Sequence, residues 1–113
     1  MKIITTNREL TKKEKYELTS SPAIQKMTSA KGSVLEIDAF AIYTDANKDG
    51  VEQDIISIKT TDGEVFATNS ATFIREFRKM LDMFDPDPVT AVMVGTGVSK
   101  AGREFITAVY AGD

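Results

Sequence analysis

The sequence predicts one mainly β domain with a single long helix after its third strand. Three observations support this prediction. Stretches rich in β-branched and aromatic residues recur along the chain, as is typical of strands. Short groups of Gly, Asn, Asp and Thr separate them, as is typical of tight turns. One stretch instead has apolar residues at helical spacing, and the total of 113 residues leaves room for one domain only.

Residues 1–31 are predicted to form a short helical N-terminal arm, and residues 32–113 the β domain. Thr11 and Glu14 have the spacing of a capping box, so a short helix is expected through about Leu18. The arm has seven basic and three acidic side chains, whereas the remaining residues have seven basic and fourteen acidic ones. A basic arm on an acidic body can contact a nucleic acid or form ion pairs with the body.

Five strands and one helix are expected after the arm. The helix has one apolar stripe that includes Phe73, Phe77 and Phe84, and the prolines of Asp85–Pro88 end it. The strands are expected at residues 33–44, 51–60, 64–68, 89–96 and 103–110, and the helix at 71–84.

The first expected strand has two different faces. Leu35 and Tyr43 belong to a face that is apolar throughout, which is predicted to lie in the core. Phe40 belongs to the other face, together with Glu36 and Asp38. Because charged side chains stay in water, Phe40 is the aromatic residue that we expect to be exposed.

The order of three strands, one helix and two strands is that of the OB-fold, a five-stranded barrel. We therefore predict a five-stranded OB-fold barrel behind the N-terminal arm. In such barrels the loop between the fourth and fifth strands is one of two that hold an oligonucleotide. Here that loop spans residues 97–102, and with its flank it provides the cations Lys100 and Arg103. Lys59, near the end of the second strand, adds a third cation.

Composition excludes several classes of protein. The chain has no cysteine and no histidine, which rules out disulfides, thiolate metal sites and the common catalytic triads. It has no apolar run of membrane-spanning length and no apolar signal core, so we expect no membrane contact and an intracellular location. These absences favour a binding protein without catalysis, metal or cofactor.

Aromatic residues on the expected strands are the second group of candidate contacts. Unpaired bases stack on such rings for roughly 1–3 kcal/mol each, without regard to sequence. Each single ring is more often part of a core, but we expect one or two to be exposed. The five rings are Phe40, Tyr43, Phe66, Phe105 and Tyr110.

Three stretches in the same order, Gly32–Tyr43, Thr61–Thr68 and Val94–Phe105, resemble the small single-stranded-DNA-binding proteins of bacteriophages with protein-primed replication. The resemblance covers about residues 32–110. It implies an OB-fold protein that coats displaced single strands during phage DNA replication, in the cytoplasm of a bacterial host. It further implies phage replication proteins or a second copy of the chain as partners. The contacts that it implies are Tyr43, Phe66, Lys100 and Arg103, while Lys59 replaces an apolar or aromatic residue of the family pattern.

Two other function classes remain open at this stage. An OB-type module can bind a protein partner in the same groove, with its acidic body as the contact. A metal-dependent nuclease would use the carboxylates Glu36, Asp38 and Asp54, with Asp54 opposite the other two. The segment Asp45–Gly50 matches the first half of a calcium loop, but its twelfth position is Ile56, so a hairpin turn is predicted instead.

Overall fold

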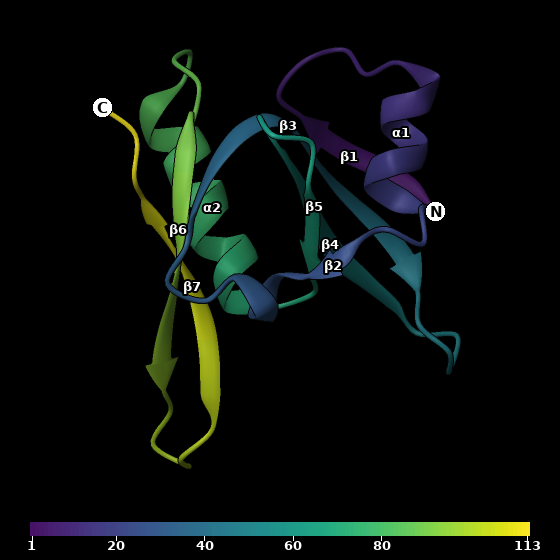
Figure 1. Cartoon of the computed structure of the whole chain (residues 1–113). Helices are drawn as coiled ribbons and strands as arrows, with labels where there is room; N and C mark the ends of the chain where they lie inside the picture. The colour runs from purple at the N-terminus through teal and green to yellow at the C-terminus, as the bar shows by residue number, and fades with distance from the viewer.

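The central strand of the fold is β3 (Val34–Ala46), which pairs along both of its edges. In the computed structural model, which describes residues 1–113, β4 (Glu52–Thr60) runs antiparallel along one edge. On the other edge β6 (Ala91–Val98) pairs with the start of β3, and β1 (Lys2–Thr6) pairs with its end. β3 is therefore shared by two parts of the sheet that curl toward each other (Figure 1).

The complete sheet has seven strands in the order β2-β5-β4-β3-β6-β7, with β1 added on β3. The mainly β prediction is confirmed, but the expected count of five strands is wrong because the N-terminal residues add β1 and β2. The sheet forms a half-barrel, since its end strands β2 and β7 are not paired with each other. The remaining elements are α1 (Lys12–Thr19), β2 (Gln25–Lys26), the 3-10 helix η1 (Met27–Ala30), β5 (Val65–Thr68), α2 (Ala71–Phe84) and β7 (Glu104–Tyr110).

Two separate apolar cores lie on the two faces of this sheet. The inner core is covered by α2, whose Phe73 and Phe77 side chains are fully buried. The outer core is covered by the N-terminal segment, which contributes Leu10 and Leu18. Residues 1–31 are thus built into the sheet and into a core.

A β-bulge in β3 exchanges the faces of the strand. The pairing of β3 with β4 shifts register between Ile37 and Ala39, and a shift of one residue turns every following side chain to the opposite face. Leu35 lies in the inner core before the bulge, and Phe40 lies in the same core after it. The prediction that Phe40 shares an exposed face with Asp38 is therefore wrong.

Three hairpins of the sheet use the same tight turn. In each, the fourth turn residue donates its backbone N–H to the first at 2.9 Å, and this fourth residue is a glycine at positive φ. The turns are Asn47–Val51, Thr60–Glu64 and Ser99–Arg103. In the first, the Asn47 side chain accepts the N–H groups of Asp49 and Val51 at 2.9 and 3.1 Å. The predicted hairpin turn is thus confirmed at this segment.

The predicted capping box at the start of α1 is confirmed. The Thr11 hydroxyl accepts the N–H of Glu14 at 3.1 Å, and the Glu14 carboxylate accepts the N–H of Thr11 at 3.0 Å. The Arg8 guanidinium also donates to Glu14 and, at 3.3 Å, to Asp38 of β3. Glu14 therefore connects the cap of α1 to the loop before it.

We expect Glu14 to make the fold sensitive to acid. Arg8 first, and the Thr11 N–H second, lower the pKa of Glu14 from 4.5 to about 2. A carboxylate with a lowered pKa stabilises the fold above about pH 4.5, and this contribution is lost as the pH falls toward 2. Urea unfolding of wild type and Glu14→Gln at pH 7 and pH 2.5 should show a smaller acid loss in the variant. An equal loss in both proteins would contradict this assignment.

Candidate nucleic-acid interface

The turn between β6 and β7 holds two predicted contacts, Lys100 and Arg103, at the end of a projecting arm. Along the edge of β6 that faces β3, the backbone hydrogen bonds end at Val94. Beyond that point the two strands continue as an isolated pair, residues 95–107, which we call the β6–β7 arm. Figure 1 shows the arm extending away from the rest of the sheet.

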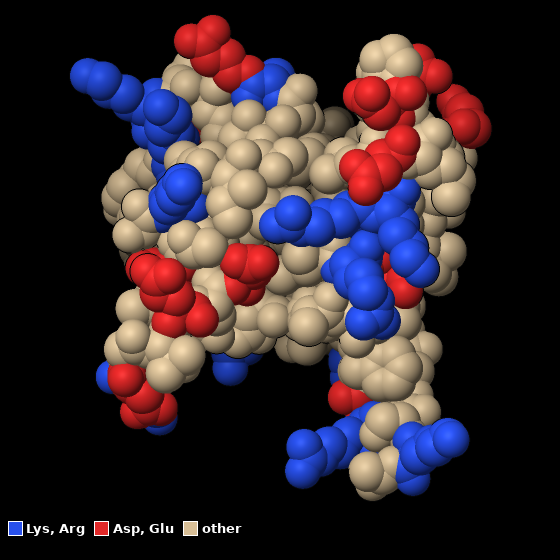
Figure 2. Space-filling model, turned by 180° about the vertical axis from the view of Figure 1, so that it is seen from behind, with Lys and Arg blue, Asp and Glu red and all other residues tan.

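The tip of the β6–β7 arm is basic and unpaired. Lys100 and Arg103 are exposed, and neither forms an ion pair. The one acidic residue of the arm, Glu104, is paired with Lys31. Figure 2 shows basic side chains at the end of the projection at its lower right. The tip can therefore offer two positive charges to an anionic ligand.

Lys59 and Tyr43 lie on the outer face of the sheet, beneath α1. The Lys59 ammonium donates to the Glu17 carboxylate at 3.1 Å, and both side chains are largely covered. Tyr43 is 3% exposed and belongs to the outer core, and burial raises the pKa of its hydroxyl. Glu17 therefore neutralises the charge of Lys59. Tyr43 has no ring face that is free to stack on a base.

Phe40 and Phe66 lie in the inner core. Phe40 is 2% exposed, and its ring meets the ring of Phe77 edge to face at a centroid distance of 4.9 Å. Phe66 is buried in the same core. The structure therefore separates the six predicted contacts into a basic tip, a covered outer face and an inner core.

One aromatic residue near the basic tip remains partly open to solvent. Phe105 of β7 is half-buried and lies opposite Gly97 of β6. Its ring lies over this glycine, since a Cβ at position 97 would stand 2.5 Å from Cζ of Phe105. The sequence offers Phe105 as one of five candidate rings, but it does not predict the position over Gly97, because the sequence pattern assigns Gly97 to the loop.

The carboxylates of the nuclease alternative do not meet. Asp54 lies opposite Thr44 and is 3.8 Å from Arg78, whereas Asp38 pairs with Arg8. Glu36 accepts the Thr61 hydroxyl at 3.3 Å. No group of three or more His, Cys, Asp or Glu side chains in the chain is arranged to hold a metal ion.

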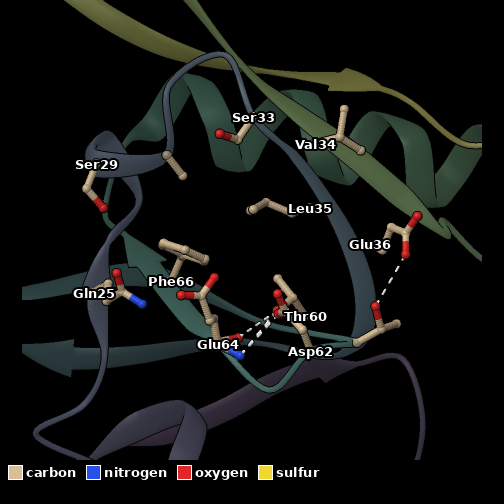
Figure 3. Close-up of a pocket in the computed structure, with 12 residues that line it drawn as sticks. Gln25, Ser29, Ser33, Val34, Leu35, Glu36, Thr60, Asp62, Glu64 and Phe66 are labelled. Carbon is tan, nitrogen blue, oxygen red and sulfur yellow. Dashed lines mark hydrogen bonds between the residues drawn. The ribbon is translucent and has the colours of Figure 1, made fainter.

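A hollow of about 520 Å³ opens between β3, η1 and the β4–β5 turn (Figure 3). Leu35 and Phe66 contribute its apolar lining, while Glu36, Asp62 and Glu64 contribute three carboxyl groups. The Thr60 hydroxyl and the Glu64 N–H donate to Asp62 and lower its pKa, so this carboxyl is charged at neutral pH. Because no Lys or Arg lines the hollow, its charge opposes the binding of a phosphate.

A second basic region lies on α2. Arg75, Arg78 and Lys79 line a surface hollow beside β4, and Figure 2 shows basic side chains gathered over this helix. Arg78 is near Asp54, and Arg75 is 3.9 Å from Glu76. Acidic neighbours thus offset two of the three positive charges on α2, whereas the two positive charges of the β6–β7 tip have no acidic partner.

Comparisons with protein-family models, with curated proteins and with solved structures gave no match for this chain. Neither of the α-helices combines the length and the apolar character that crossing a membrane requires.

Proposed function

We propose that this protein binds single-stranded DNA without sequence preference and acts without catalysis. The observation that supports the proposal most strongly is the tip of the β6–β7 arm. There Lys100 and Arg103 are exposed and unpaired, and Phe105 lies nearby with its ring partly open. Two cations for phosphates beside an aromatic ring are the elements of a sequence-tolerant single-strand site.

The charge of the whole chain favours a single strand over a duplex. Duplex DNA requires a broad positive surface to replace its condensed counterions. This chain has a net charge of −3, and on the face shown in Figure 2 its basic side chains lie in separate groups. Stacking on a ring also requires unpaired bases, which a duplex does not offer.

The OB-fold reading supports the same function. The strands β3, β4, β5, β6 and β7, with α2 after β5, follow the OB order, and β3 is shared between both halves of the sheet. In this reading the β6–β7 turn is one of the two loops that hold an oligonucleotide. By its resemblance to phage proteins, we further propose that the protein coats displaced strands during phage DNA replication.

The double variant Lys100→Ala/Arg103→Ala tests the basic tip. Each lost phosphate contact on a single strand lowers the slope of log K against log salt by about 0.7, so we expect a decrease of about 1.4. Titration of fluorescent oligo-dT at several salt concentrations measures this slope.

Lys48→Ala is the matched control. Lys48 occupies the second position of the equivalent β3–β4 turn, but the acidic residue Asp49 follows it directly in the sequence. We expect its loss to leave the slope within experimental error of wild type. If the double variant also keeps the wild-type slope, the basic tip does not contact the phosphates and this part of the proposal is wrong.

A further inference from the structure

We infer that the bases of the bound strand lie on the outward face of β3, β6 and β7, next to the basic tip. This inference rests on the proposed function and adds the surface on which it takes place. We call this surface the base face. Its residues are Val34, Met93, Gly95, Gly97, Phe105, Thr107 and Val109.

The face that an OB-fold ordinarily offers to a nucleic acid is partly covered in this chain. OB-folds bind on their second and third strands, which correspond here to β4 and β5. The outer side of these strands is covered by the N-terminal segment, with Leu18 fully buried against the outer core. The one lysine expected there, Lys59, is paired with Glu17 of α1.

The base face is mostly apolar and uncovered, and its charged neighbour on β3 is Glu36, which shares the outward face with Val34. Register places Val34, Met93 and Val109 side by side across the three strands, and Val34 and Val109 are 53% and 43% exposed. In Figure 1 α2 lies behind β6 and β7, and no helix lies in front of them. An exposed apolar surface of this kind is typical of a binding site.

Two glycines shape the base face for flat ligands. Because positions 95 and 97 are glycines, β6 has no side chain on the base face after Met93, and the Phe105 ring lies over Gly97. An aromatic ring packed over a glycine also stabilises the strand at that position. The result is a low surface on which a base can stack.

The charges at the end of the base face match the phosphates of a nucleic acid. The backbone N–H of Ser99 donates to Arg103 at 2.8 Å, so these two residues continue the ladder beyond Gly97 and Phe105. Strand alternation then places Arg103 on the same face as Phe105. When bases lie on the base face next to the tip, their phosphates can reach Lys100 and Arg103.

Tryptophan fluorescence tests this placement directly, because the natural chain has no tryptophan. Phe105→Trp places a single tryptophan on the base face, and Tyr16→Trp places one on the exposed side of α1, where Tyr16 is 54% exposed. On addition of oligo-dT we expect saturable quenching in the first variant and none in the second. Phe105→Leu should weaken oligo-dT binding roughly 5- to 150-fold, while Phe105→Tyr should retain it.

Three other results would contradict either this inference or the proposed function. If wild type binds oligo-dT but only Tyr16→Trp is quenched, the strand crosses the α1 side; the inference is wrong and the proposed function stands. If Phe105→Trp fluorescence changes with protein concentration alone, a second copy of the chain covers the face and the inference is wrong. If wild type binds no single strand, the proposed function itself is wrong. Melting curves confirm that each variant is folded.

Discussion

Phe40→Ala is expected to lower the free energy of unfolding by about 3–5 kcal/mol, the usual cost of removing a buried phenylalanine ring. Phe40 is 2% exposed and packs edge to face on Phe77, which itself packs on Phe73. The loss would be a large fraction of the 5–15 kcal/mol by which domains of this size are commonly stable. Urea unfolding measures it.

Oligo-dT binding by the folded fraction of Phe40→Ala should equal that of wild type. Phe105→Leu is the control, since it should lose binding with a smaller loss of stability because Phe105 is only half-buried. A well-folded Phe40→Ala protein that no longer binds DNA would show that this ring contacts the strand after all.

Leu18→Ala is expected to lower the free energy of unfolding by about 2–5 kcal/mol. Leu18 lies on α1 but is fully buried in the outer core, to which Tyr43 and Val65 of the sheet also belong. Because the N-terminal segment and the sheet share this core, the loss should appear in one cooperative transition of the whole chain.

Tyr16→Ala is the matched control for this prediction. Tyr16 lies on the exposed side of the same helix, so its replacement should change stability by no more than about 0.5 kcal/mol. If residues 1–31 were an independent arm, Leu18→Ala would leave the unfolding of the sheet unchanged, and that result would contradict the structure described here.

Local patterns predicted the elements well. The helix expected at residues 71–84 is observed over the same residues, because its apolar stripe, its Ser70 cap and the following prolines all act within a few residues. The capping box of α1 and the hairpin turns were predicted for the same reason. Each of these signals depends on neighbours in the sequence.

Contacts between distant parts of the chain were not predicted. The bulge between Ile37 and Ala39 depends on the pairing of β3 with β4, and no residue type within β3 marks it. The partner of Lys59 is Glu17, which lies 42 residues earlier. When residues 1–31 are taken as a separate arm, nothing is predicted to cover the outer face of the sheet, which is why Lys59 is expected to be free.

The most direct test of the central claim is a competition between single-stranded and duplex DNA for the wild-type protein. Fluorescent oligo-dT is bound at physiological salt, and unlabelled oligo-dT or an unlabelled duplex of equal length is then added. We expect that unlabelled oligo-dT displaces the probe and that the duplex does so only at a much higher concentration. Equal displacement by both competitors would contradict this prediction.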